Sequence, residues 1–79
     1  MVHILLFAGL AQQAKTEKVT IDVNSPLSVE EIRGLLQNQV GPLKGIEHAL
    51  VAVNEEYVEL TDQVKDGDTV AFIPPVSGG

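Results

Sequence analysis

The sequence predicts an α+β fold in which one main helix packs across one face of a mixed sheet. Three observations indicate this class: apolar runs near both ends of the chain, a strictly alternating segment after the first run, and one amphipathic segment with helix-capping residues. The chain has 79 residues, of which 44% are hydrophobic. We therefore expect a single domain with one modest core.

Two strands and a short helix are predicted in the first third of the chain. Residues 2–8 are rich in β-formers and predict a strand that is apolar on both faces. Residues 8–16 are rich in Ala and Gln and predict a short helix. Residues 18–23 alternate polar and apolar residues up to a turn at 24–26, which predicts a second strand. The residues expected on its core face are Val19, Ile21 and Val23.

The main helix is predicted to begin after Ser28, because Ser28–Glu31 matches a capping box. In this motif the serine hydroxyl and the glutamate carboxylate each accept a hydrogen bond from a backbone N–H that has no helical partner. Gly41 and Pro42 are predicted to end the helix. Apolar residues recur at helical spacing between these limits, and we expect them on the buried face: Val29, Ile32, Leu35, Leu36 and Val40.

Further strands are predicted in the second half of the chain. Residues 50–53 predict one strand, and Asn54-Glu55 predicts a turn into another over residues 57–60. A polar turn at residues 65–68 leads to the last strand, which is predicted over residues 69–73. The order of elements is thus strand, helix, strand, main helix and several strands, which is typical of an α+β domain.

The first and last strands are predicted to lie side by side at the centre of the sheet, because both are apolar on both faces. A β-grasp, or ubiquitin-like roll, satisfies this order with one long helix crossing the sheet. The last strand must end at Pro74-Pro75, since proline cannot donate a backbone hydrogen bond. We therefore assign residues 1–75 to a β-grasp domain and residues 76–79 to an extended, flexible C-terminal Gly-Gly tail.

Composition argues against several functions. The net charge is −6 and the five basic residues are scattered singly, which disfavours binding to nucleic acid or to an anionic membrane. The chain has no cysteine, and its apolar start has no basic leader region and is too short to span a membrane, so a cytoplasmic protein is expected. His3 and His48 are 45 positions apart in a chain without cysteine, so no metal site is expected. No nucleophile, base and oxyanion-stabilising set can be assembled, which disfavours an independent enzyme.

The C-terminal segment is the strongest candidate for function. Its two prolines favour an extended chain that projects off the sheet, and its two glycines have no Cβ to obstruct a narrow channel. Six extended residues span about 20 Å, which is enough to enter a partner's active site. The carboxylate of Gly79 can then be adenylated on ATP and attacked without steric obstruction. The residues predicted to thread into the partner are Pro74, Pro75, Val76, Ser77 and Gly78.

Three segments of the chain resemble the small subunits of molybdopterin synthase, which are sulfur carriers of the ubiquitin-like ThiS family. They are Phe7-Ala8-Gly9-Leu10, residues 51–58 (VAVNEEYV) and residues 65–79, which end in the specific motif AFIPPVSGG. The resemblance covers essentially the whole chain. One departure is that Ala11 and Gln12 stand where the family often has a basic and then an acidic residue, so no polar partner contact is implied there.

The resemblance implies that Gly79 is adenylated by a ubiquitin-activating-like enzyme, which uses ATP, and is converted to a thiocarboxylate by a sulfur donor system. The tail would then enter the large synthase subunit, where catalysis is expected, and sulfur would pass to a cyclic pyranopterin monophosphate to form the molybdopterin dithiolene. Because the dithiolene holds two sulfurs, two carriers would serve each product, in a heterotetrameric synthase. The chain itself would be a non-catalytic, sulfur-donating subunit that binds no cofactor.

Phe7, Tyr57 and Ile73 are the residues expected to bind the partner. All three are expected on the side of the sheet away from the main helix, beside the exit of the tail. An exposed apolar patch at that place would be a protein interface. The alternative is that these side chains are ordinary core residues.

Two other functions would use the same tail. One is a ubiquitin-like modifier that forms an isopeptide bond between Gly79 and a target lysine. The other is a thiocarboxylate carrier for thiazole synthesis or tRNA thiolation. These functions differ from the molybdopterin reading only in the acceptor, whereas a merely frayed glycine-rich terminus would have no acceptor at all.

Overall fold

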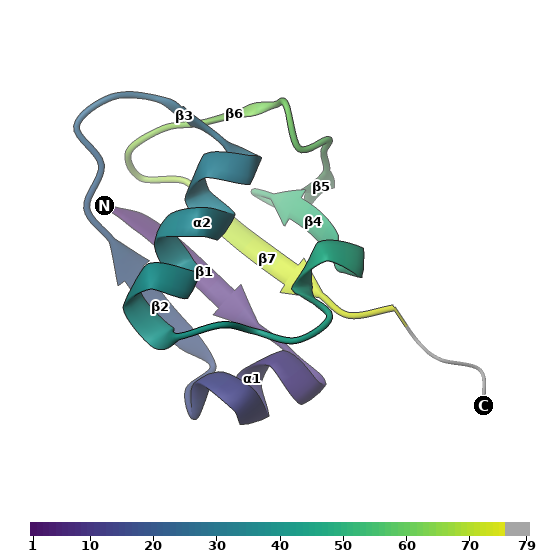
Figure 1. The fold of residues 1–79 in the computed structure, drawn as a ribbon. Coiled ribbons are helices and arrows are strands. Elements are labelled where there is room, and N and C mark those ends of the chain that lie inside the picture. The colour runs from purple at the N-terminus through teal and green to yellow at the C-terminus, as the bar shows by residue number, and fades with distance from the viewer. Residues whose placement is uncertain (76–79) are drawn as a thin grey trace.

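The computed structural model describes residues 1–75, which form a five-stranded mixed sheet with one main helix across one of its faces (Figure 1). The strand order is β2-β1-β7-β4-β5. This arrangement confirms the predicted α+β class and the β-grasp architecture. The predictions for Val76, Ser77, Gly78 and Gly79 concern residues outside the part of the chain that the structure describes.

The central pair of strands consists of β1 (Val2–Leu6) and β7 (Thr69–Ile73), which run parallel. Ile4 lies opposite Val70 and Leu6 lies opposite Phe72. These four side chains are buried, and they face the main helix. The sequence predicted this central pairing correctly from the apolar character of both strands. Only the face toward α2 is fully buried, because the alternating residues on the other face are exposed or half-buried.

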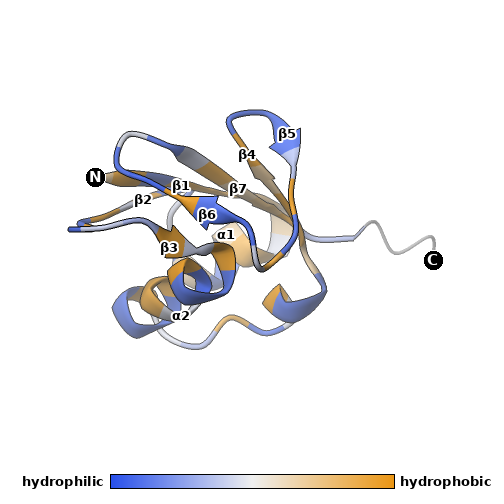
Figure 2. Cartoon of the chain, turned by 90° about the horizontal axis from the view of Figure 1, so that it is seen from above, coloured by the Kyte–Doolittle hydropathy of each residue, from blue (hydrophilic) through white to orange (hydrophobic). Residues whose placement is uncertain are grey.

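The remaining strands pair antiparallel with this centre. Strand β2 (Lys18–Ile21) pairs with β1 and forms one edge of the sheet. Strand β4 (Leu50–Val53) pairs with β7 and is followed by the short strand β5 (Glu56–Tyr57) at the other edge. The hydropathy colouring in Figure 2 shows the contrast between hydrophobic central strands and the hydrophilic strand β5.

Helix α2 (Val29–Val40) begins at the predicted capping box. The Ser28 hydroxyl accepts a hydrogen bond from the Glu31 backbone N–H at 3.1 Å, and the Glu31 carboxylate accepts one from the Ser28 backbone N–H at 3.0 Å. The bond from the Ser28 backbone N–H, and after it the nearby Ser28 side chain, lower the pKa of the Glu31 carboxyl below its ordinary value. Gly41, with a φ of +95°, ends the helix as predicted.

The prediction for one residue of the buried helix face is wrong. Leu35 is 37% exposed, whereas Val29, Ile32 and Leu36 are completely buried. A helix turns by about 100° per residue, so Leu35 lies about 60° beyond Ile32, at the margin of the apolar stripe. The stripe that packs on the sheet is therefore narrower than the sequence suggested.

Helix α1 (Ala8–Ala14) lies at the end of the sheet, where it follows β1 (Figure 1). Its Leu10 side chain is buried in the core, as the short predicted helix implies. The Gln13 side chain amide donates to the Lys44 carbonyl at 2.9 Å and accepts from the Lys44 backbone N–H at 2.7 Å. This two-point contact holds the loop after α2 against α1.

The segment after β5 differs from its prediction as a strand over residues 57–60. The chain leaves the sheet edge after Tyr57, because two backbone carbonyls of the following segment accept hydrogen bonds from the start of α2. The Leu60 carbonyl accepts from the Glu30 backbone N–H at 3.1 Å, and the Asp62 carbonyl accepts from the Val29 backbone N–H at 2.9 Å. Residues 58–62 thus satisfy amides in the first turn of α2 that have no helical partner.

Three short elements were not predicted. Strands β3 (Leu27–Ser28) and β6 (Gln63–Val64) pair antiparallel beside the start of α2, and the 3₁₀ helix η1 (Ile46–His48) leads into β4. Each has only two or three residues, which is too few to show a periodic pattern in the sequence. The largest fully buried side chains come from the longer elements, apart from Val64: Phe72, Ile4, Leu10, Ile32, Leu36, Val2, Val29, Val64 and Val70.

Candidate functional site

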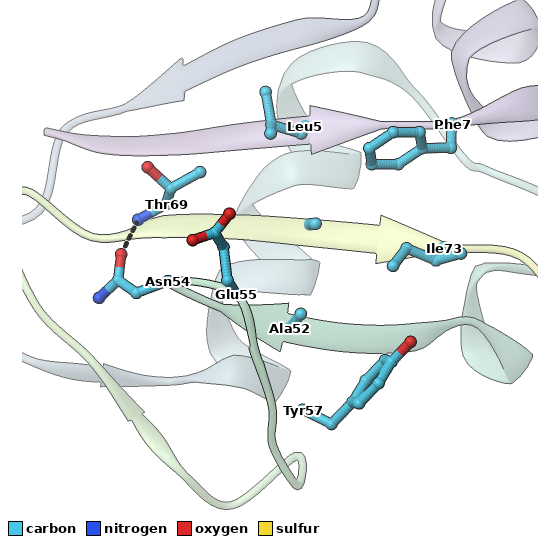
Figure 3. Close-up of a pocket in the computed structure, with 9 residues that line it drawn as sticks. Leu5, Phe7, Ala52, Asn54, Glu55, Tyr57, Thr69 and Ile73 are labelled. Atoms are coloured by element: carbon cyan, nitrogen blue, oxygen red, sulfur yellow. Dashed lines mark hydrogen bonds between the residues drawn. The ribbon is translucent and has the colours of Figure 1, made fainter.

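The face of the sheet opposite α2 is open and forms a shallow hollow (Figure 3). Side chains alternate along a strand, so each central strand presents to this face the residues between those that face α2. The centre of the hollow is formed in this way by Leu5 of β1, Ala71 of β7 and Ala52 of β4. Nine residues line it in total: Leu5, Phe7, Ala52, Asn54, Glu55, Tyr57, Thr69, Ala71 and Ile73.

The hollow brings together the three residues predicted to bind a partner. Phe7 follows β1 and is 44% exposed, Tyr57 of β5 is 72% exposed, and Ile73 at the end of β7 is half-buried. Because β1 and β7 are parallel, with Leu6 opposite Phe72, the chain places Phe7 beside Ile73. None of the three belongs to the buried core, and Phe7 and Tyr57 are among the exposed large hydrophobic residues within residues 1–75.

Two further apolar residues of this face were not among the predicted partner-binding residues. Leu5 lines the centre of the hollow. Leu50 lies directly opposite Ile73 in the β4–β7 register and is 52% exposed. The signal was present in the alternation of both strands, since each residue stands two positions from another residue of the open face.

The predicted exit of the tail lies at the Phe7 end of the hollow. Strand β7 ends at Ile73, followed by the half-buried Pro74 and the exposed Pro75. Two successive prolines cannot extend the ladder, so the chain leaves the sheet here. The predicted reactive residue, Gly79, is four positions beyond Pro75 and lies outside the described part of the chain.

A polar network closes the other end of the hollow. The Asn54 side chain amide donates to the Asp68 carboxylate at 3.0 Å, and the Asn54 side chain oxygen accepts from the Thr69 backbone N–H at 3.0 Å. The second Asp68 oxygen accepts from the Lys65 backbone N–H at 3.0 Å. This network fastens the β4–β5 turn to the start of β7, so it fixes where the turn residue Glu55 stands over the hollow.

Asp68 is expected to make the stability of the fold depend on acidity. The bond from the Lys65 N–H, and then the Asn54 amide, hold the pKa of the buried Asp68 carboxyl below its ordinary value. The ionised Asp68 carboxylate therefore stabilises the fold fully above the unfolded pKa of about 4. This contribution is lost as the pH falls through the lower pKa of the folded state. We predict that Asp68→Asn melts well below wild type at pH 7, and that this gap narrows at pH 3. Thermal unfolding at both pH values measures this, and a constant gap would contradict it.

The other polar candidates have structural roles. Glu30 and Glu31 lie in the first turn of α2, and residues 65–68 form a turn with Gly67 at a φ of +93°. Within residues 1–75, no group of three potential metal ligands comes together, and His3 and His48 lie on separate elements. None of the helices in this described part is long and apolar enough to cross a membrane.

Comparison with known proteins gives a consistent result over nearly the full chain. The family model described as the ThiS family matches residues 4–79. The molybdopterin synthase sulfur carrier subunit of Drosophila sechellia is 36% identical over 81 aligned positions, which cover 99% of this chain and 90% of that protein.

Solved structures agree with the sequence matches. Small archaeal modifier protein 1 of Haloferax volcanii superposes with a TM-score of 0.83 at 30% identity, covering 99% of this chain and 98% of that one. A chain in the complex of subunits 1 and 2 of the molybdopterin-converting factor from Helicobacter pylori superposes with a TM-score of 0.69 at 29% identity, covering 99% and 97%. We conclude that the chain belongs to the ThiS family, with sulfur carrier subunits of molybdopterin synthase among its relatives.

Proposed function

We propose that the chain is the sulfur carrier subunit of a molybdopterin synthase and that its working group is the carboxylate of Gly79. One observation supports this most strongly. The chain matches a molybdopterin synthase sulfur carrier subunit over 99% of its length, and the family match extends through Gly79 itself. The geometry is compatible, because the central strand β7 leads to this segment from beside an exposed apolar face.

The proposed chemistry begins with activation of the terminal carboxylate. An oxygen of the Gly79 carboxylate attacks the α-phosphorus of ATP on the activating enzyme, which gives an acyl adenylate and releases pyrophosphate. Hydrosulfide delivered by the donor system then attacks the acyl carbon, which releases AMP and leaves a thiocarboxylate. In the large subunit this sulfur is transferred to the pterin precursor, and water restores the carboxylate. The chain provides the acyl group, while both partner enzymes provide catalysis.

The partners are proposed to dock on the open face of the sheet. Phe7, Tyr57 and Ile73 give this face an apolar patch, and they stand next to the point where the chain leaves β7. Aromatic side chains on an exposed patch are typical of interface hot spots. A partner bound there would hold the chain so that its last residues reach an active site.

We predict that Phe7→Ala or Ile73→Asp weakens binding to the large subunit by about tenfold or more, since each removes or disrupts apolar contact at the end of the hollow beside the exit of β7. Isothermal titration calorimetry measures the dissociation constants. Leu35→Ala is the matched control, because Leu35 is an exposed apolar residue on α2, which covers the opposite face. If Phe7→Ala and Ile73→Asp both bind with wild-type affinity, these two residues are not part of the interface.

Reconstitution tests the function directly. The chain is incubated with ATP, an activating enzyme and a sulfur donor, and its C-terminus is analysed by mass spectrometry for replacement of one oxygen by sulfur. The charged chain is then mixed with the large subunit and the cyclic pterin precursor, and dithiolene formation is expected. If the chain carries the thiocarboxylate but yields no pterin product, the pterin precursor is not its sulfur acceptor, and thiazole synthesis or tRNA thiolation stays open.

A protein modifier is the second candidate, and one finding favours it. The structural match to small archaeal modifier protein 1 of Haloferax volcanii has a TM-score of 0.83, higher than the 0.69 of the molybdopterin-converting factor chain. If the chain acts as a modifier, incubation with cell extract and ATP will give higher-mass conjugates that resist reductant and mild base. The molybdopterin proposal expects no such conjugates.

A further inference from the structure

Among the nine residues that line the hollow, one is charged: Glu55, in the turn between β4 and β5. Figure 3 shows its carboxylate directed over β7 on the Thr69 side, whereas Phe7 and Ile73 lie toward the other end. The hollow therefore has an acidic end, and an apolar end beside the exit of β7.

Within residues 1–75 Glu55 forms no ion pair, although Lys65 contacts Asp68 at this end of the sheet and Lys18 lies opposite Leu5 on the same face. All five lysines and arginines lie within residues 1–75, and the ion pairs there join the N-terminal amine to Asp66 and His48 to Glu47. Glu56 and Glu59 follow Glu55, and no lysine or arginine occurs between residues 45 and 64. Glu56 lies opposite Val53, which packs against the core, so Glu55 is the acid that this turn presents to the open face. A carboxylate without an ion-pair partner can attract a cationic group of another protein.

The backbone at Glu55 is also unusual for a glutamate. Asn54 has a φ of +51° and Glu55 a φ of +71°, so the two-residue turn uses left-handed conformations at both positions. Asn followed by Gly is the favoured pair for such a hairpin turn, because glycine adopts positive φ without steric cost. A glutamate at the second position gives up some turn stability, and it places a carboxylate at the end of the hollow.

We propose that the open face docks a partner protein that sets a lysine or arginine against Glu55 while its apolar side chains fill the hollow toward Phe7 and Ile73. This inference rests on the proposed function and adds the chemistry of the partner's docking surface. A second copy of the chain is a poorer occupant, because two chains of net charge −6 repel each other. A basic side chain at one end and an apolar contact at the other would also fix the partner's orientation.

Calorimetry with the isolated large subunit tests the charge pair. Glu55→Gln is expected to weaken binding about tenfold at low salt and to flatten the salt dependence that wild type shows. Glu30→Gln is the matched control, because Glu30 is an exposed acid in the first turn of α2, on the opposite face, and its loss changes the net charge equally. It is expected to bind like wild type.

A glycine at the same position separates binding from stability. Glu55→Gly is expected to raise the melting temperature, because the turn becomes Asn-Gly, and to weaken binding as Glu55→Gln does. A stabilised variant with reduced affinity cannot owe that loss to unfolding. Glu55→Lys is expected to weaken binding further, because it would set two cations together.

The outcomes distinguish this inference from the function on which it rests. If Glu55→Gln binds with wild-type affinity and salt dependence while Phe7→Ala binds weakly, the charge pair is rejected and the carrier function stands. If the wild-type chain does not bind the large subunit at all, both are rejected. If sedimentation shows that the wild-type chain dimerises and that Glu55→Gln abolishes the dimer, a second copy occupies the face and the inference is overturned.

Discussion

Removing Gly79 is expected to abolish sulfur transfer and to leave the melting temperature of the chain unchanged. The deletion moves the terminal carboxylate back by about 3.5 Å, one residue of extended chain, so it no longer reaches the position where the partner's groups act. A misplacement of about 1 Å can already cost about 100-fold in rate. The buried core, which extends along β7 only to Phe72, keeps all of its contacts.

Two measurements check this prediction. Product formation is followed with the activating enzyme, the sulfur donor and the large subunit, and unfolding is followed by calorimetry on the isolated chain. A chain extended by one residue beyond Gly79 is the companion variant, because it keeps both glycines and displaces only the carboxylate. Product from either variant at the wild-type rate would show that the terminal carbon is not the reacting atom.

The longer elements of this fold could be predicted from the sequence because each has enough residues to show its period. Helix α2 has twelve residues and a capping box, so both its start and its end were correct. Strand β7 is apolar on both faces and is followed by two prolines, which placed it in the centre of the sheet and fixed its last residue. In both cases the hydrophobic pattern and the residues that end the element predict the same boundary.

Tertiary contacts decided the parts that were wrong or missing. Residues 58–60 alternate like a strand, yet the chain leaves β5 so that the Leu60 and Asp62 carbonyls can accept from amides of α2. That requirement depends on how the helix docks, which the local sequence does not contain. Leu35 was misplaced because it lies at the margin of the apolar stripe, where the sequence pattern alone does not separate a buried residue from an exposed one.

The candidate site was predictable only in its apolar half. Alternation along β1 and β7 placed Phe7 and Ile73 away from the helix, and the β4–β5 register brought Tyr57 to the same face. Glu55 was correctly interpreted as a turn residue, but its position over the hollow depends on the positive φ values of the turn and on the Asn54–Asp68 contact. A turn signal in the sequence does not say where its side chain points.

Phe72→Ala is expected to produce the largest loss of stability of any single truncation in the chain, about 3–5 kcal/mol. Phe72 is completely buried at the centre of the sheet, between β1 and β4 and facing α2. Truncation leaves a cavity that rigid central strands cannot close. Small domains have a total stability of about 5–15 kcal/mol, so this variant would be near its unfolding limit. Urea denaturation with a shared slope measures the difference.

Phe7→Ala is the matched partner of that variant, because the same side chain is truncated at the end of the neighbouring strand. Phe7 is 44% exposed on the opposite face, so its loss should cost about 1 kcal/mol or less. The two phenylalanines are thus expected to show opposite behaviour: Phe72 supports the fold, and Phe7 supports partner binding. If Phe7→Ala destabilised the chain as much as Phe72→Ala, Phe7 would be a core residue, and any loss of partner affinity in that variant would follow from unfolding.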